Sequence, residues 1–284
     1  MSRPVTVVEV GPRDGLQNEA VVVPTTAKVE LVERLAEAGL PVVEVTSFVS
    51  PRAVPQLADA DAVLPAVRRR PGVRYPVLVP NVRGLERALA AGADAIAVFT
   101  AASEAFTQAN INMSVAESLH AFAPVLERAR AGGMWTRGYV STAFGCPYQG
   151  AVEPAAVADV AGALFELGCD EVSIGDTIGV ARPEQVPEVV GAVTARVPID
   201  RVALHLHDTG GLALDNAAAG LAAGVRTFDS SAGGLGGCPF APGAPGNVAT
   251  EALVEMLHER GYETGVDLEA VRAAGAWMRG LVGR

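Results

Sequence analysis

The chain has 284 residues, of which 50% are hydrophobic, enough to bury the core of one large domain or two small ones. Its formal net charge of −10 argues against a nucleic-acid-binding protein, because phosphate backbones require an excess of lysine and arginine. The sequence has no uncharged apolar run of about 18 residues or more, so we expect neither a membrane span nor a membrane partner.

The N-terminus enters a strand-like run almost at once, which predicts a protein without a signal or transit peptide and therefore a cytoplasmic location. The cysteines, Cys146, Cys169 and Cys238, are widely spaced and form no CxxC pair. This spacing argues against a disulfide framework and against a zinc ribbon. We interpret Cys146 and Cys169 as apolar packing residues.

Short runs rich in β-branched residues alternate with longer helical patterns along the chain. We predict strands at 5–10, 42–47, 74–79, 95–100, 136–141, 171–176, 202–207 and 227–231. The stretches between them carry apolar residues at three-to-four spacing, as amphipathic helices do. Several of these stretches end in glycine, which suits the position after a helix: Gly39, Gly92, Gly168 and Gly224.

Strands that are apolar on both faces are typical of a parallel sheet with helical crossovers. Eight strand–helix units in about 250 residues have the count and size of a TIM barrel. A doubly wound open sheet is the alternative, but the first strand lacks a GxGxxG turn. We therefore predict an α/β fold, a (β/α)₈ TIM barrel, as a single catalytic domain over 1–284. The barrel is expected at about 5–260 and a C-terminal helical extension at about 261–284.

Charged side chains lie at or near the ends of the predicted strands, where a TIM barrel places its chemistry. Arg13 and Asp14 follow the first strand, Glu44 lies inside the second, and Asp176 ends the sixth. Each has a plainer interpretation, since an Arg-Asp pair after a strand is often a surface turn. A buried glutamate can also simply satisfy backbone amides.

The seventh strand ends in "HLHD", which places His205 and His207 two residues apart and on one face of the strand. In a closed parallel barrel the strand ends ring one mouth, so both histidines and Asp14 can reach a single ion. Imidazole and carboxylate ligands without a thiolate suit octahedral Mg²⁺, Mn²⁺ or Co²⁺. Zinc also binds imidazole and stays open as an alternative.

Six motifs stand out along the chain: "VEVGPRDGLQNE", "TSFVSP", "GYVSTAFGCPY", "GDTIG", "HLHDT" and "GGLGGCPFAPGAPGNVATE". They resemble those of the 3-hydroxy-3-methylglutaryl-CoA lyase family, whose members are metal-dependent aldol-type TIM barrels. The Arg-Asp-Gly and His-x-His elements also occur in isopropylmalate and homocitrate synthases, so they identify only the wider group. The cysteine-containing loop is the specific signal.

The resemblance implies a divalent metal, Mg²⁺ or Mn²⁺, bound by Asp14, His205, His207 and the amide of Asn247. This ligand set agrees with the one that the strand ends suggest, and the resemblance adds Asn247 to it.

The resemblance also implies the catalytic residues Arg13, Cys238, Glu44 and Asp176. Arg13 matches the arginine that stabilises the enolate of the departing acetyl-CoA. Cys238 matches a cysteine that takes part in catalysis on a loop that closes over the site. Glu44 and Asp176 match acidic residues of the same site.

The activity implied is retro-aldol cleavage of 3-hydroxy-3-methylglutaryl-CoA to acetyl-CoA and acetoacetate, by a homo-oligomer (dimer or tetramer), in leucine degradation and ketone-body metabolism. The chain departs from the family at 210–212, where it has Gly-Gly-Leu instead of Tyr-Gly-Gln, and at Ala20, often lysine. These changes leave citramalyl-CoA or a longer 3-hydroxy-3-alkylglutaryl-CoA open as substrates. A condensing synthase and a non-catalytic scaffold barrel are the remaining alternatives.

Overall fold

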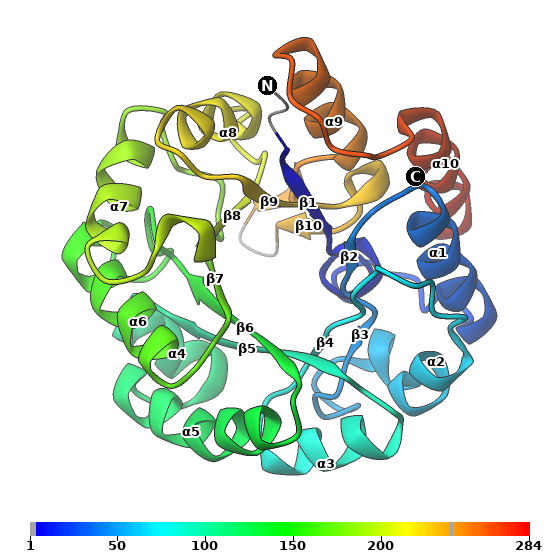
Figure 1. Cartoon of the computed structure of the whole chain (residues 1–284), viewed down its shortest axis with the longest axis horizontal. Helices are drawn as coiled ribbons and strands as arrows, with labels where there is room; N and C mark the ends of the chain where they lie inside the picture. The colour runs from blue at the N-terminus through cyan, green and yellow to red at the C-terminus, as the bar shows by residue number, and fades with distance from the viewer. Residues whose placement is uncertain (1–3, 239–240) are drawn as a thin grey trace.

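The computed structural model describes residues 4–238 and 241–284, and for residues 238 and 241–244 it describes the backbone alone. A ring of strands is surrounded by helices (Figure 1). The strands are β1 Thr6–Glu9, β2 Val42–Val43, β3 Thr46–Ser47, β4 Val77–Leu78, β5 Ala95–Ala101, β6 Trp135–Ser141, β7 Glu171–Asp176, β8 Val202–Leu206, β9 Thr227–Ser230, β10 Gly237–Cys238 and β11 Ala241–Pro245.

Over the described ranges, β1 to β9 form one parallel sheet in the order β2-β1-β9-β8-β7-β6-β5-β4-β3, and β10 pairs with β11 in an antiparallel ribbon. The two ends of this order, β2 and β3, are consecutive pieces of one segment. Between them, the Glu44 amide donates to the Glu9 carbonyl (2.8 Å) and the Val45 amide donates to the Pro76 carbonyl (2.9 Å). The sheet is therefore curled and TIM-barrel-like, with the segment 42–47 lying between β1 and β4.

The helices alternate with the strands along the chain. They are α1 Thr25–Glu37, α2 Ala60–Ala66, α3 Val82–Ala90, α4 Glu104–Ile111, α5 Val115–Ala131, α6 Pro154–Glu166, α7 Gln185–Thr194, α8 Ala213–Ala222, α9 Thr250–Glu259 and α10 Leu268–Val282. Short helical turns lie at η1 Gly11–Gly15, η2 Pro55–Leu57, η3 Ile199–Arg201 and η4 Ala232–Gly234. The glycines predicted to follow helices all have positive φ, from +83° to +103°: Gly39, Gly92, Gly168 and Gly224.

The main hydrophobic core lies between the sheet and the helices. Strand residues such as Val7, Val43 and Val98 belong to one buried cluster with helix residues such as Leu31 and Leu85. The inside of the sheet is different, because charged side chains share it with small apolar clusters. Alternation of side chains along each strand thus separates an apolar outer face from a partly polar inner one.

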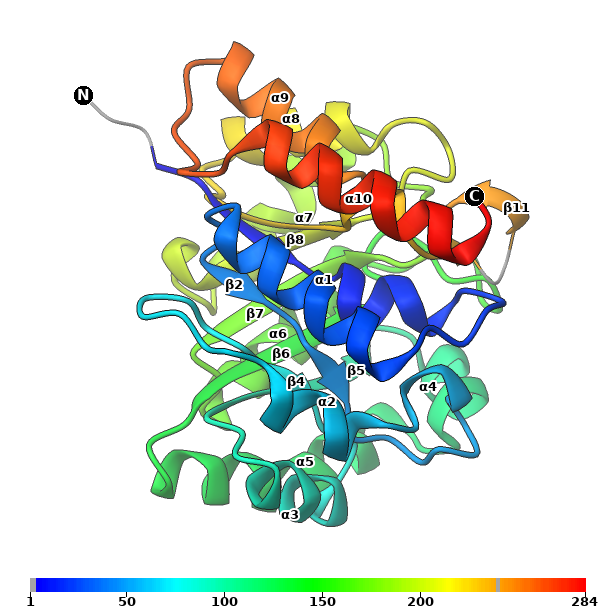
Figure 2. The same cartoon turned by 90° about the vertical axis from the view of Figure 1, so that its right-hand side faces the viewer.

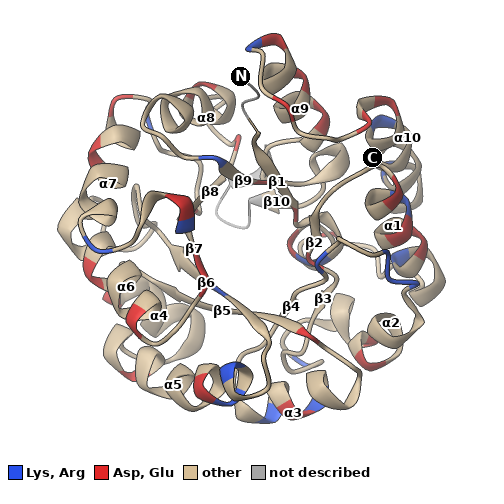
Figure 3. Ribbon diagram, in the orientation of Figure 1, with Lys and Arg blue, Asp and Glu red and all other residues tan. Residues whose placement is uncertain are grey.

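The C-terminal helix α10 packs against α1, α9 and the turn η4. Its last turn lies on the same side of the molecule as β11, whereas β1 begins on the opposite side (Figure 2). Basic and acidic residues are interspersed around the outer helices (Figure 3). Across 4–238 and 241–284, no helix combines the length and apolar character that a membrane crossing requires.

Candidate active site

The turn η1 places Arg13 and Asp14 directly after β1. The amide nitrogens of Arg13 and Asp14 both donate to the carbonyl of Val10, at 3.1 and 2.7 Å, which folds the chain back over the strand end. Gly15 follows, and a Cβ there would lie 2.9 Å from both Leu235 Cβ and Ser231 Oγ. Glycine at this position therefore lets the turn pack closely against the segment after β9.

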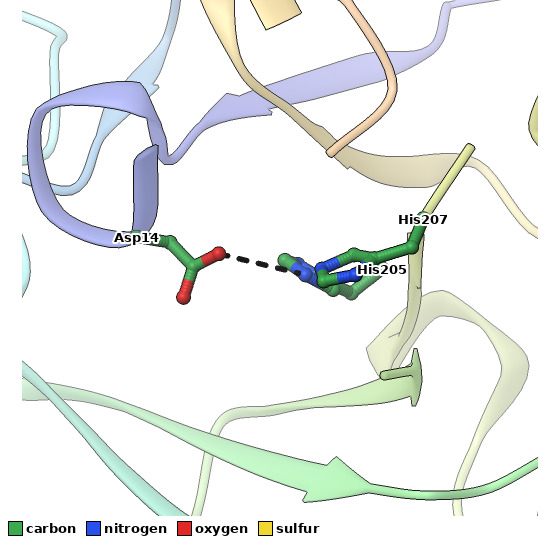
Figure 4. Close-up of side chains that lie close together, drawn as sticks. All are labelled: Asp14, His205 and His207. Atoms are coloured by element: carbon green, nitrogen blue, oxygen red, sulfur yellow. Dashed lines mark ion pairs between the residues drawn. The ribbon is translucent and has the colours of Figure 1, made fainter. Parts of the chain in front are cut away.

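Asp14, His205 and His207 form a cluster in which one ligand atom of each residue lies within 4.8 Å of the others. Figure 4 shows the carboxylate facing the two imidazoles, which come from the end of β8. His205 Nε2 lies 4.0 Å from Asp14 Oδ2. Bonds of about 2.1 Å to a cation such as Mg²⁺ separate octahedral ligand atoms by about 3 to 4.2 Å, and the 4.0 Å separation lies within this range, so the cluster could hold a divalent cation.

His207 is in the form that binds a metal. Burial, reinforced by the charge of His205, lowers the pKa of His207 to about 4, so its imidazole is neutral near pH 7. Its Nδ1 atom is buried and has no hydrogen-bond partner among the described residues. An unpartnered buried nitrogen is costly without a ligand, which supports a cation beside this histidine.

Asp14 is held as a carboxylate by its neighbours. Burial alone would raise its pKa, but the charge of Arg13, joined by those of His205 and His207 when they are protonated, outweighs burial and holds the pKa well below the usual range. The amide nitrogen of Asn247 also donates to Asp14 Oδ2 at 2.9 Å. Because the amide nitrogen is used in this way, Asn247 would offer a cation its oxygen.

Arg13 is buried and held from several sides. Its guanidinium donates through Nε to Glu44 Oε2 at 2.7 Å and through Nη1 to Asp14. The guanidinium carbon lies 5.3 Å from the centre of the Tyr139 ring, and the Tyr139 hydroxyl donates to Glu44 at 3.1 Å. Glu44 therefore lies behind Arg13 and fixes its orientation beside the metal cluster.

Asp176 is placed differently from the other predicted residues. Its two carboxylate oxygens accept the backbone amides of Val180 and Ala181, each at 3.0 Å, in the loop after β7. It does not belong to the Asp14 cluster, and its position indicates that it organises this loop. The side chain of Cys238, in β10, lies outside the described residues. The catalytic roles of Asp176 and Cys238 both stay predictions.

Asp229, which no sequence motif marked, is a buried residue of β9 that lies directly behind the cluster. Its Oδ2 accepts from His205 Nδ1 at 3.1 Å and from Ser173 Oγ at 2.9 Å, and its Oδ1 accepts from Arg137 Nη2 at 2.6 Å. This bond places the proton of a neutral His205 on Nδ1 and leaves Nε2 as the ligand atom. An ionisable residue inside the strand pattern "TFDSS" was the available signal.

Replacing Asp229 with asparagine is expected to weaken divalent-metal binding by about 10–100-fold, the usual cost of losing a carboxylate behind a ligating histidine. The asparagine keeps the size of the side chain but no longer fixes the His205 tautomer. Titration calorimetry with Mn²⁺ measures the effect. Ser173→Ala, which removes only a hydroxyl donor to Asp229, is the control. Equal affinity in Asp229→Asn and the control would contradict this role.

Glu9 is a second buried carboxyl that the sequence patterns did not mark, and it lies on the outer side of the sheet. Its Oε1 accepts from the amides of Gly11 (2.8 Å) and Ala232 (2.9 Å), and its Oε2 accepts from Thr250 Oγ1 (2.7 Å). Burial outweighs these bonds and raises its pKa from 4.5 to about 7. Glu9 thus ties the base of η1 to the segment after β9 and to the start of α9.

The raised pKa of Glu9 predicts that the protein loses stability as the pH rises. Between pH 4.5 and about 7 the folded state binds more protons than the unfolded state, so the free energy of unfolding falls across this window. Glu9→Gln is uncharged throughout and is expected to reduce the loss by up to about 3 kcal/mol. Urea unfolding at about pH 5 and pH 8 measures it. Glu30→Gln, on an exposed face of α1, is the control, and an equal loss in both variants would contradict the prediction.

A sequence profile, a curated relative and a solved structure all match this chain to the same family. The sequence profile of the HMGL-like family matches residues 4–277. The mitochondrial hydroxymethylglutaryl-CoA lyase of Bos taurus is 54% identical over 274 residues, which cover 96% of this chain and 84% of the bovine protein. The crystal structure of the HMG-CoA lyase from Brucella melitensis is 54% identical, covers 100% of both chains and superposes with a TM-score of 0.98.

A third structure carries ligands. The HMG-CoA lyase from Acinetobacter baumannii, in complex with coenzyme A and 3-methylmalate, is 38% identical and superposes with a TM-score of 0.93 over 99% of this chain and 92% of the other. The sequence profile and these relatives extend over nearly the whole chain, including η1, β8 and the segment after β9. The chain therefore belongs to the HMGL-like family.

Proposed function

We propose that this protein is a divalent-metal-dependent carbon–carbon lyase that cleaves 3-hydroxy-3-methylglutaryl-CoA to acetyl-CoA and acetoacetate. The observation that carries the proposal is the buried guanidinium of Arg13 beside the Asp14–His205–His207 cluster. Family membership supports it, because the bovine and Brucella relatives are named as lyases for this acyl-CoA.

The residues present suit a retro-aldol cleavage. A divalent cation bound by Asp14, His205, His207 and Asn247 would polarise the substrate's hydroxyl and carboxylate oxygens. Arg13 supplies positive charge where the oxygen of the thioester enolate forms, and Glu44 keeps the guanidinium in that orientation. The low pKa of Asp14 keeps its carboxylate ionised beside that charge. We include Cys238 and Asp176 among the catalytic residues on the strength of the motif resemblance.

The acyl-CoA class of the substrate is supported by the Acinetobacter relative, whose structure holds coenzyme A. The methylglutaryl group is the finer part of the proposal, since positions 210–212 and Ala20 depart from the common family pattern. Citramalyl-CoA and longer 3-hydroxy-3-alkylglutaryl-CoA thioesters are the competing substrates.

The test is an assay of the purified protein with Mg²⁺ or Mn²⁺ and a panel of these thioesters, with acetoacetate and acetyl-CoA as the measured products. We expect the highest kcat/KM with 3-hydroxy-3-methylglutaryl-CoA. Cleavage of citramalyl-CoA alone would overturn the assignment of the acyl group. Absence of cleavage of every thioester would overturn the lyase proposal itself.

We further infer that the curled sheet is a closed (β/α)₈ barrel and that the whole chain is one catalytic domain with α10 as its extension. The backbone bonds of Glu44 and Val45 to opposite neighbours support closure. A cytoplasmic location and a dimeric or tetrameric state stay predictions. Light scattering measures the oligomeric state.

A further inference from the structure

The segment between β9 and β10 is held by two carboxylates at backbone amides three residues apart. The amide of Gly233 donates to both oxygens of Glu251, at 2.9 and 3.1 Å. The amide of Gly236 donates to Glu19 Oε1 at 2.9 Å. Glu251 lies in the first turn of α9, whereas Glu19 lies five residues after Asp14 in the loop that follows η1.

Each of these carboxylates is paired with an arginine from the end of the chain. Arg279, in α10, has Nη1 3.7 Å from Glu251 Oε1. Arg284, just after α10, has Nη1 2.9 Å from Glu19 Oε1, the same oxygen that accepts the Gly236 amide. The Glu19 side chain is only 8% exposed, so its charge depends on these two donors more than a solvated carboxylate would.

Gly236 directly precedes β10, which contains Cys238, and it lies close to residues beside Asp14. Its φ is +92°, and a Cβ there would lie 3.1 Å from both the Cα of Gly15 and Nδ2 of Asn247. Gly15 follows Asp14 directly, and Asn247 bonds to Asp14. The position of Gly236 therefore sets where the next two residues, 237 and 238, begin relative to the Asp14 cluster.

We propose that Glu19 and Arg284 are positioning residues for Cys238: the Arg284–Glu19 ion pair fixes the Gly236 amide and so places the cysteine two residues later. Glu251, paired with Arg279, fixes the amide of Gly233. Glu19, paired with Arg284, fixes the amide of Gly236, which is nearer to Cys238. Four of the six residues 233–238 are glycine, so without the second contact the segment regains conformational entropy that folding had removed. The catalytic part of this proposal rests on the lyase function proposed above.

The first variant is Arg284→Ala, with Arg284→Lys as the charge-conserving rescue. Arg272→Ala is the matched control, because Arg272 lies in α10 and pairs with Glu255 and Glu269 away from the glycine segment. We expect Arg284→Ala to lower kcat by about tenfold while KM changes by less than about twofold, since a small misplacement of a reacting group is costly. Arg284→Lys should recover most of kcat, and Arg272→Ala should match the unmodified chain.

The second readout is the rate at which iodoacetamide alkylates Cys238, located by peptide mapping. Cys146 and Cys169 are buried, and burial raises the pKa of Cys169 to about 12, so both should react slowly. Arg284→Ala and Glu19→Gln should each change the Cys238 rate several-fold without a change in thermal midpoint. The double variant should resemble either single variant, because both act through one contact.

Alkylation needs no substrate, so it tests the positioning proposal even if no thioester is cleaved. A chain that cleaves no thioester but shows the altered Cys238 rates would overturn the lyase function and support the positioning role. Rates and kcat values in Arg284→Ala equal to those in Arg272→Ala would overturn the positioning role.

Discussion

EDTA is expected to abolish thioester cleavage, and an excess of Mg²⁺ or Mn²⁺ is expected to restore it. Asp14 and two histidines place their ligand atoms within 4.8 Å of one another, an arrangement that a divalent cation would stabilise. The loss should be at least about 1,000-fold, because a cation of this kind contributes several kcal/mol to stabilising charge in the transition state. Initial rates at increasing metal concentration measure the recovery.

His207→Ala tests the same site without a chelator. The variant should bind Mn²⁺ far more weakly and fold normally, since the imidazole has no hydrogen bond through Nδ1 among the described residues to lose. His120→Ala, on an exposed part of α5, is the matched control. Full activity of the exhaustively chelated protein, or unchanged Mn²⁺ affinity in His207→Ala, would rule out the metal site.

Replacing Arg13 with glutamine is expected to lower kcat by about 100–1,000-fold, with a smaller change in KM. The guanidinium is already fixed by Glu44 and Asp14, so we expect it to stabilise a forming enolate without reorganising. Steady-state kinetics with the preferred thioester measure both constants. Arg13→Lys should recover little, because a lysine cannot bond to both carboxylates in the planar geometry of arginine.

A metal titration separates this effect from damage to the cluster. Arg13→Gln should still bind Mn²⁺, since Arg13 is not a ligand and both histidines remain. A change confined to KM would instead assign Arg13 to anchoring the substrate.

The periodicity of the sequence located each strand of the sheet to within a few residues, because strands buried on both faces leave continuous apolar runs. The segment 42–47 is the exception in detail. It was predicted as one strand, and it is two short strands around Glu44 and Val45. The Glu44 amide bonds to β1 and the Val45 amide bonds to the segment before β4. These partners depend on how the sheet closes, which cannot be predicted from the residues of 42–47 alone.

The sequence predicts which charged residues follow the ends of parallel strands, whereas it does not show which buried residues become partners across the fold. Asp14, His205 and His207 converge because parallel strands end at one rim. Asp229 carried the same signal as Glu44, an acid inside a strand, but its partner His205 lies 24 residues away. Glu19 and Arg284 are 265 residues apart, and neither stands out in its own neighbourhood.

The pairing of Arg284 with Glu19 has a practical consequence for handling the protein. An affinity tag or a surface linker joined after Arg284 would emerge on the side of the molecule where β11 lies (Figure 2), beside Glu19. The same addition before β1 would emerge at the opposite end of the strands. Assays, immobilisation and fluorescent labelling are therefore best carried out through the N-terminal side, where the attachment lies away from the carboxyl ends of the strands and from Asp14.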